Sequence, residues 1–193
     1  MSDPVLHIIV GPNGAGKSTL YDKVIGPVTH LDFVNADVIA RENWPDEPEA
    51  RSYEAAELAA ERRAVLINDR ASFVTETVFS HESKLALLRD AIDAGYLVAC
   101  HVLVIPVELA VARVANRAQW GGHFVPEDKI RSRYGRLWPL VVEAIGLVER
   151  AVVYDNSRPE APFRVIAVFE HGAVLGEPDW PSWSPEELQN AGR

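Results

Sequence analysis

Short apolar runs and amphipathic segments alternate along this chain. Runs rich in β-branched and aromatic residues, each about as long as a buried strand, occupy residues 5–10, 31–35, 72–75, 96–105, 150–154 and 163–169. The run at 96–105 is almost continuously apolar, which is typical of a strand buried on both faces of a parallel sheet. The pattern therefore predicts a central sheet built largely from parallel strands.

Segments of helical periodicity stand between these runs. They predict helices over residues 17–24, 47–70, 82–94, 106–118 and 126–148. In the second helix the predicted inward positions are Tyr53, Ala56, Ala60, Ala64 and Ile67. We expect the first helix to stop before Gly26-Pro27 and the third to stop at Gly95, because proline and glycine end helices. The alternation predicts a three-layer α/β fold with a mainly parallel sheet. We expect one domain over residues 1–175 and a C-terminal tail over 176–193.

Composition narrows the class of protein. A chain of 193 residues with 48% hydrophobic content is long enough to bury a sizeable core. Its net charge of −9 repels phosphate backbones, so we expect no nucleic acid partner. The single cysteine, Cys100, lies in an apolar run and is predicted to be a buried, inert thiol. We expect neither a signal peptide nor a membrane span, which together indicate a cytoplasmic protein without a membrane partner.

A glycine-rich loop follows the first predicted strand. It has the spacing G-x-x-x-x-G-K-S and consists of Gly11, Pro12, Asn13, Gly14, Ala15, Gly16, Lys17, Ser18 and Thr19. Between a strand and a helix, this spacing is typical of the P-loop, whose backbone N–H groups and helix N-terminus surround a phosphate. We predict that these residues bind ATP, that Lys17 contacts the outer phosphates during catalysis and that Ser18 holds Mg²⁺. A chance match in a glycine-rich turn is the alternative.

Two acidic residues follow predicted strands at the edge that carries the P-loop. Ligands of parallel sheets bind at the carboxyl ends of the strands, and Asp37 and Glu76 stand there. We predict that Asp37 accepts the proton of an attacking hydroxyl. Glu76 is predicted to bind a polyhydroxylated substrate, with Thr77 and Ser80 adding polar contacts. The alternatives are that Asp37 caps the next helix, that Glu76 is a solvated loop acid, or that either acid completes a Mg²⁺ shell or orders a water.

Basic residues concentrate between residues 113 and 136 of this acidic chain. Arg113 and Arg117 are four residues apart and share a predicted helix face, and we predict that both bind ATP. On the next predicted helix, Arg133 and Arg136 share a face with Lys129. We predict that these two arginines are catalytic and neutralise the transferring phosphoryl group. The alternative for each arginine is a solvated basic helix face.

A joint at Gly121-Gly122-His123 separates these two helices. We therefore expect a helical, arginine-rich lid that closes over a triphosphate, whose oxygens arginine binds in pairs. His123 is assigned to the substrate contacts, and its alternative role is to cap a turn. No spacing of His, Cys and Asp points to a structural metal site.

Taken together, these residues resemble the zeta-toxin-like P-loop kinases, in particular their short stand-alone members. Besides the P-loop, the resemblance is carried by Asn35-Ala36-Asp37, Glu76-Thr77, Gly121-Gly122-His123, Val125-Pro126, Arg133-Tyr134 and Tyr154-Asp155-Asn156-Ser157. These elements are spread over residues 5–157. The resemblance implies a three-layer P-loop kinase-type α/β fold and a kinase that requires ATP and Mg²⁺.

The resemblance also carries expectations about substrate and partner. The characterised toxins phosphorylate the 3′-hydroxyl of UDP-N-acetylglucosamine, so a sugar nucleotide is implied as the acceptor. Asp37 is implied as the base, Glu76 as part of the sugar-nucleotide pocket and residues 154–157 as neighbours of adenine. An antitoxin protein is left open as a partner. One departure is His123, which stands where the toxins carry a lid arginine, and another is the absence of glycine after Glu76-Thr77.

Other functions stay open at this stage. A regulatory nucleotide-binding protein would hydrolyse ATP slowly without any small-molecule acceptor. A kinase for another hydroxyl substrate would use the same P-loop and the same base. A polynucleotide kinase is disfavoured by the net charge of −9. The chain lacks the run Asn-Lys-x-Asp that reads guanine, which favours ATP over GTP without excluding the latter.

Overall fold

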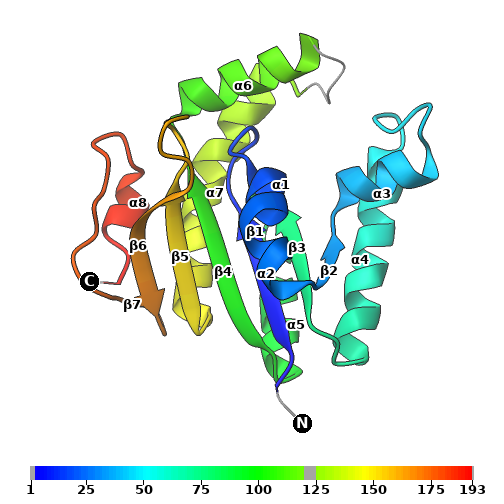
Figure 1. Ribbon diagram of the computed structural model, residues 1–193, viewed down its shortest axis with the longest axis horizontal. Coiled ribbons are helices and arrows are strands. Elements are labelled where there is room, and N and C mark those ends of the chain that lie inside the picture. Colours follow the sequence, from blue (N-terminus) through cyan, green and yellow to red (C-terminus); the bar gives the residue numbers. More distant parts are fainter. Residues whose placement is uncertain (1–2, 120–124, 193) are drawn as a thin grey trace.

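A mixed, mainly parallel sheet forms the centre of the molecule (Figure 1). A computed structural model describes residues 3–119 and 125–192. In these residues the strands follow the order β2-β3-β1-β4-β5-β6-β7. Their bounds are β1 (Val5–Val10), β2 (Asp32–Val34), β3 (Phe73–Thr77), β4 (Leu97–Val104), β5 (Arg150–Asp155), β6 (Arg164–Glu170) and β7 (Ala173–Val174). Strands β2 to β5 in this order pair in parallel, whereas β6 and β7 are antiparallel.

Helices cover both faces of the sheet. They are α1 (Lys17–Leu20), the π-helical turn η1 (Tyr21–Ile25), α2 (Gly26–Thr29), α3 (Ala36–Asn43), α4 (Ser52–Asn68), α5 (Ser83–Asp93), α6 (Val107–Gln119), α7 (Glu127–Leu147) and α8 (Glu186–Gln189). Buried residues of α4, α5, α7 and α8 form one core cluster with Leu6 and Ile8 of β1. Buried residues of α1, η1 and α6 form a second with Ile9. The predicted three-layer α/β fold is therefore confirmed.

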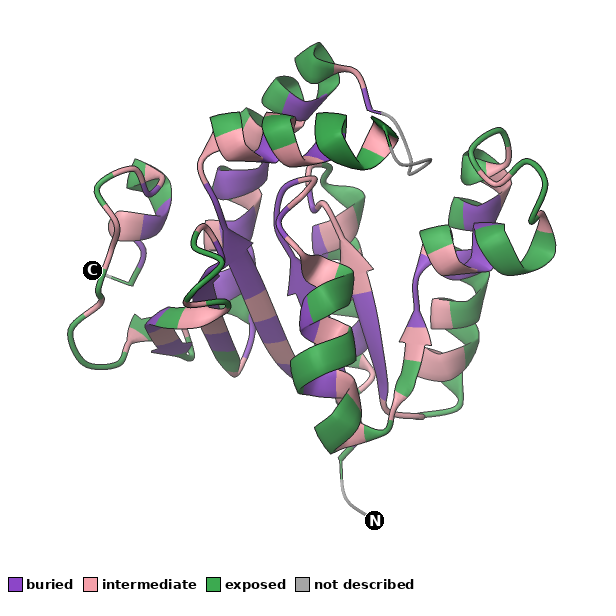
Figure 2. Cartoon of the chain, turned by 45° about the horizontal axis from the view of Figure 1, so that its top comes forward, coloured by how far each residue is buried: buried purple, intermediate pink, exposed green. Residues whose placement is uncertain are grey.

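Alternation along the strands explains the two clusters. Successive side chains of a strand point to opposite faces, so Ile8 and Ile9, both fully buried, belong to different clusters. Figure 2 shows the central strands mostly buried and the outer faces of the helices mostly exposed. The middle of the sheet thus holds the carboxyl ends of its parallel strands rigidly, which fixes the position of the loops that follow them.

The predicted stop before Gly26-Pro27 is wrong. The helical segment continues to Thr29 and ends at His30, which has a left-handed φ of 53°. The backbone N–H of Gly26 donates to the carbonyl of Tyr21, five residues back. This π-helical turn starts a new helical register, so Pro27 stands in the first turn of α2, where its missing N–H needs no partner.

Residues after 175 pack on the same core. Leu188 of α8 is fully buried, and α8 lies against α7. Asp179 donates its backbone N–H to the carbonyl of Ile166 on β6, at 2.8 Å, and its side chain pairs with Arg164. The segment is therefore held by side chains and backbone alike.

Two further expectations concern the body of the molecule. Cys100 is buried on β4, so the predicted burial of this thiol is confirmed, and burial raises its pKa to about 12. Within the described ranges, no helix combines the length and the apolar character needed to cross a bilayer.

Candidate active site

The P-loop connects β1 to α1, as predicted, and two of its glycines are required by space. Gly11 has a φ of +152°, and a Cβ at this position would lie 2.7 Å from the carbonyl oxygen of Leu103. Gly16 has a φ of +91°, and its Cβ would lie 2.6 Å from Nδ2 of Asn156. Side chains are rarely tolerated at such a φ. The loop therefore sits directly on the ends of β4 and β5.

Asn156 holds the P-loop from the far side. Its Nδ2 donates to the carbonyl of Ala15 at 2.8 Å, and its Oδ1 accepts from the backbone N–H of Phe163 at 3.4 Å. The side chain is almost fully buried. The resemblance included this residue without giving it a structural role, because nothing in the spacing of a loop asparagine predicts that it will reach a segment 141 residues earlier.

Lys17 lies over the P-loop. Its Nζ donates to the carbonyls of Gly11 and Pro12, each at 3.2 Å. Burial lowers the pKa of this ammonium, and the charges of Glu76 and Asp37 oppose the shift. The ammonium is therefore held between the loop and two carboxylates, at the place where the outer phosphates of a nucleotide bind a P-loop.

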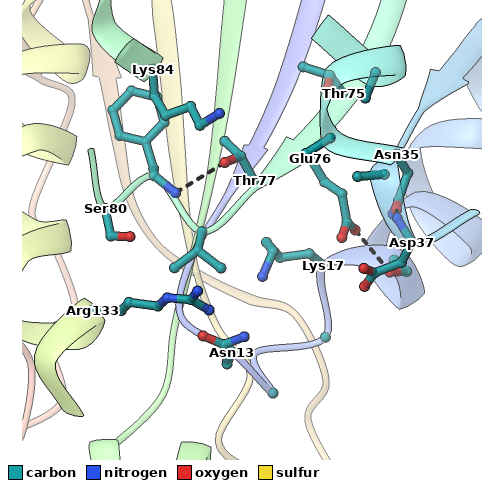
Figure 3. Close-up of a pocket in the computed structure, with 18 of the residues that line it drawn as sticks. Asn13, Lys17, Asn35, Asp37, Thr75, Glu76, Thr77, Ser80, Lys84 and Arg133 are labelled. Carbon is teal, nitrogen blue, oxygen red and sulfur yellow. Dashed lines mark hydrogen bonds between the residues drawn. The ribbon is translucent and has the colours of Figure 1, made fainter. Parts of the chain in front are cut away.

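A cavity of about 630 Å³ opens beside the P-loop at the carboxyl ends of β1, β2 and β3. It brings together most of the side chains that the sequence predicted for the site. On its wall are Asn13, Gly14, Gly16, Lys17, Ser18, Thr19, Asp37, Glu76, Thr77, Ser80, Arg113, Arg117 and Arg133. Figure 3 shows Lys17, Glu76 and Asp37 directed toward one part of this cavity, with Arg133 on the other side of Lys17.

At the start of α3, one residue caps the helix and another presents its carboxylate to the cavity. Asn35 caps the helix, since its Oδ1 accepts from the backbone N–H of Asp37 at 2.7 Å and from that of Val38 at 3.2 Å. The alternative in which Asp37 caps α3 is therefore wrong. Asp37 is exposed on the cavity wall, where its carboxylate is accessible to a bound substrate.

Glu76 faces the P-loop serine. The Ser18 hydroxyl donates to Oε2 of Glu76 at 2.9 Å. Thr75, the preceding residue, is buried and donates its hydroxyl to the carbonyl of Val34 at 2.8 Å, which fixes β3 against β2. Burial raises the pKa of the Glu76 carboxyl, while the Lys17 charge and the Ser18 hydrogen bond oppose the rise. The alternative of a solvated loop acid is wrong for this residue.

The donor set near the P-loop suits a hard cation. The Ser18 hydroxyl and the Glu76 carboxylate are in contact, and Mg²⁺ prefers oxygen ligands, with substrate phosphates and water completing its shell. Among the described residues, no group of three or more His, Cys, Asp and Glu side chains is arranged to hold a metal by itself. These residues therefore fit a magnesium ion that arrives with a nucleotide.

The arginines of α6 and α7 separate into two groups. Arg113, Arg117 and Arg133 line the cavity, and Nη1 of Arg113 lies 3.4 Å from the carbonyl of Gly14. Arg136 is exposed outside this cavity and donates to the carbonyl of Ser132 at 3.3 Å. Arg131 pairs with Glu108 and Glu127 on the helix surface. The predicted joint Gly121-Gly122-His123, with the substrate contact assigned to His123, lies outside the described residues.

Two cations of the cavity wall were missed by the sequence reasoning. Arg63 comes from α4 and Lys84 from α5, and both are half-buried on the wall. A signal for Arg63 exists, since it lies four residues after Ala59 and eight after Ala55, the buried positions of α4. The predicted inward row, which began with Tyr53, is wrong: Tyr53 is 74% exposed.

A second cavity of about 520 Å³ also borders the P-loop. Its wall combines Gly14, Gly16 and Thr19 with Lys23, Arg113, Asn156, Pro162 and Phe163. The loop after β5, which the resemblance placed near adenine, supplies Asn156. The P-loop thus borders both this cavity, walled by Phe163, and the larger one walled by acids and cations.

Comparison with known proteins adds the family. Residues 6–137 match the family described as AAA domain. The chain belongs to the AAA domain family. This AAA domain protein is also 30% identical, over 125 residues, to a protein of Haemophilus influenzae described as uncharacterized. The match covers 64% of this chain and 88% of the relative.

Solved structures share the fold of this AAA domain protein. The PezAT chromosomal toxin–antitoxin system of Streptococcus pneumoniae matches with a TM-score of 0.66 and 14% identity, over 98% of this chain and 84% of that one. The structure of AvrRxo1-ORF1:-ORF2 with ATP matches with a TM-score of 0.69 and 17% identity, over 91% of this chain and 61% of that one. A protein of Chloroflexus aurantiacus, provisionally named a kinase, matches with a TM-score of 0.64 and 18% identity, over 82% of this chain and 91% of that one. The fold is that of P-loop kinases, as the resemblance implied.

Proposed function

We propose that the protein is an ATP- and Mg²⁺-dependent kinase that transfers the γ-phosphate to a hydroxyl of a small molecule. The observation that carries this proposal is the shared cavity, in which Lys17 of the P-loop faces the accessible Asp37 carboxylate. This cavity of about 630 Å³ is in the size range of small-molecule sites, and it extends from the P-loop to polar side chains of β3 and the loop after it, such as Thr77 and Ser80.

The P-loop side of the cavity binds and orients the triphosphate in this proposal. Lys17 exchanges the carbonyls of Gly11 and Pro12 for phosphate oxygens. Arg113, Arg117 and Arg133 approach the same region from the lid helices, where their charge stabilises the transferring phosphoryl group. When bound, Mg²⁺ neutralises the phosphate oxygens, and Ser18 and Glu76 are the residues that hold it.

Asp37 performs the proton transfer. The acceptor hydroxyl oxygen forms a bond to the γ-phosphorus, and the bond between this phosphorus and the β–γ bridging oxygen breaks, so ADP leaves. The hydroxyl proton passes to the Asp37 carboxylate. Asn35 keeps that carboxylate out of the helix cap, because it satisfies the N–H groups that would otherwise attract it.

The acceptor proposed is UDP-N-acetylglucosamine or a related sugar nucleotide. Support comes from the resemblance to the zeta-toxin-like kinases and from the fold shared with the PezAT system. Glu76, Thr77 and Ser80 line the cavity and supply polar contacts for a sugar. An antitoxin protein is the partner that this function implies.

Mass spectrometry of the reaction products tests the proposal. Purified protein is incubated with ATP, Mg²⁺ and UDP-N-acetylglucosamine, beside the variants Lys17→Ala and Asp37→Asn. We expect a product heavier by one phosphoryl group from the unaltered protein and none from Lys17→Ala. Asp37→Asn should slow transfer by about 10²–10⁴-fold, while equilibrium dialysis shows ATP binding retained.

Asp90→Asn is the matched control, because Asp90 is exposed on α5 away from the residues that line the cavity. It should transfer phosphate at the normal rate. Transfer by Asp37→Asn at that same rate would remove the assignment of the base. If the protein binds ATP but forms no product with any hydroxyl acceptor, the result would favour a regulatory ATPase instead.

A further inference from the structure

Arg63 and Lys84 stand out among the cations of the cavity because neither forms a salt bridge with an acid among the described residues. Their neighbours in sequence behave differently. Arg62 pairs with Asp32 at 3.2 Å on the surface, and Arg89 of α5 pairs with Glu143. The two half-buried cations have no such partner. The chain has a net charge of −9, so a shortage of carboxylates does not explain this.

The two side chains line the same cavity. Arg63 comes from α4 and Lys84 from α5, and both line the same wall. Burial lowers the pKa of each, and the Arg63 charge further lowers the pKa of Lys84, so the two cations are near enough to repel. Figure 3 shows the Lys84 side chain reaching into the cavity on the side of Thr77. Two partly desolvated like charges destabilise the protein unless an anion neutralises them.

The pair comes from different elements than the cations beside the P-loop. Lys17, Arg113, Arg117 and Arg133 already supply cations beside the P-loop. The elements that carry Arg63 and Lys84 pack against the other core cluster, with β1, β3 and β4, rather than with the P-loop helix. The pair thus comes from elements on the other side of the sheet from α1.

We propose that Arg63 and Lys84 form an anion subsite for the acceptor, which carries a phosphate or diphosphate group besides the hydroxyl that is phosphorylated. A guanidinium fork binds two phosphate oxygens at once, and an ammonium adds a second charge. Ser80, also on the wall, supplies a hydroxyl donor. The inference rests on the proposed function, because it takes this cavity as the acceptor site of a kinase. It excludes neutral sugars as good acceptors.

Binding and kinetics of the full chain test the subsite. Equilibrium dialysis against the protein saturated with Mg²⁺ and a non-hydrolysable ATP analogue, which occupies the P-loop, measures UDP-N-acetylglucosamine, N-acetylglucosamine 1-phosphate and neutral N-acetylglucosamine. We expect Arg63→Gln and Lys84→Gln each to weaken binding of the two anionic probes about tenfold. Binding of the neutral sugar should be weak and unchanged. Arg62→Gln, the adjacent surface arginine, is the matched control and should bind like the unaltered protein.

The kinetic signature follows from the role in binding. In Arg63→Gln the KM for the anionic acceptor should rise about tenfold, with kcat and the KM for ATP within twofold of normal. Equal affinities of all variants for the anionic probes, or no binding of either anionic probe to the unaltered complex, overturns the subsite. A failed kinase reaction with the anion binding still lost in Arg63→Gln overturns the proposed function alone, so the two failures are distinguishable.

Discussion

Asn35 and Asp37 divide two tasks between neighbouring side chains at the start of α3. An amide accepts the hydrogen bonds of the helix start, and a carboxylate two residues later is left facing the cavity. Both residue types are common helix caps, so sequence alone left the choice open. The distinction matters because a carboxylate engaged in a cap is a weaker base for a substrate hydroxyl.

Loss of the cap should disturb both stability and catalysis. Asn35→Ala removes two hydrogen bonds to backbone N–H groups and should destabilise the protein by about 1 kcal/mol. The Asp37 carboxylate is then drawn to the freed N–H groups, so kcat should fall as well. Thermal unfolding and transfer assays measure the two effects. Asn68→Ala, at the exposed end of α4, is the comparison, and a normal kcat in Asn35→Ala would contradict the division of tasks.

At the scale of elements, the strand pattern predicted more than the helix pattern did. The apolar run at 96–105 corresponds to β4, whose paired neighbours on both sides bury it. The face of α4 was predicted wrongly because alanines occur on several of its sides, so periodicity selects no single stripe. Ala55 and Ala59 are buried whereas Tyr53 is exposed. Arg63 was missed for the same reason, since its face was not identified.

In the site as well, features set by neighbouring residues in the sequence were predictable, whereas contacts between distant segments were not. The P-loop and the two acids, Asp37 after β2 and Glu76 near the carboxyl end of β3, were predictable, because a strand end determines where the nearby residues lie. Contacts between segments far apart in the sequence were not. The hydrogen bond of Asn156 to Ala15 and the approach of Lys84 to Arg63 depend on how loops and helices pack, which no spacing records.

The helices α6 and α7 allow the arginine roles to be separated experimentally. Arg133→Gln should lower kcat by 10-fold or more, roughly the effect of one charged contact to the transferring group, because Arg133 is the arginine of α7 on the cavity wall. We expect a smaller loss from Arg136→Gln. Arg131→Gln, which breaks only the exposed pairs with Glu108 and Glu127, should have little effect on stability and leave kcat normal. Steady-state kinetics decide, and equal values for Arg133→Gln and Arg131→Gln would remove the predicted role of Arg133.

At the scale of the whole molecule, a row of partly buried polar rings crosses the sheet. Nδ1 of His7 lies 3.0 Å from Nε2 of His101, and Nδ1 of His101 lies 3.2 Å from the hydroxyl of Tyr154. Burial lowers the pKa of His101 from 6.5 to about 3 and also lowers that of His7. The folded protein therefore holds both imidazoles neutral across β1 and β4.

This row predicts acid sensitivity of the fold. Between about pH 6.5 and 3 the unfolded chain binds more protons than the folded one, so stability falls as the pH is lowered. Each histidine contributes a slope of at most about 1.4 kcal/mol per pH unit. Urea unfolding at several pH values should show a smaller slope in His101→Gln. His171→Asn, an exposed position with a left-handed φ of 46° that asparagine tolerates, should keep the original slope, and an unchanged slope in His101→Gln would contradict the account.

The partly buried charges of Lys17 and Glu76 have a consequence for ligand binding. Burial depresses the ammonium pKa and elevates the carboxyl pKa. A bound triphosphate raises the pKa of the Lys17 ammonium again, and a bound cation lowers the pKa of the Glu76 carboxyl. Binding of a nucleotide and its cation to the P-loop therefore also exchanges protons with the solvent. Under alkaline conditions Lys17 takes up protons, and under acidic conditions Glu76 releases them. The heat of the same binding event would then differ from buffer to buffer, by the ionisation enthalpy of whichever buffer supplies or absorbs those protons.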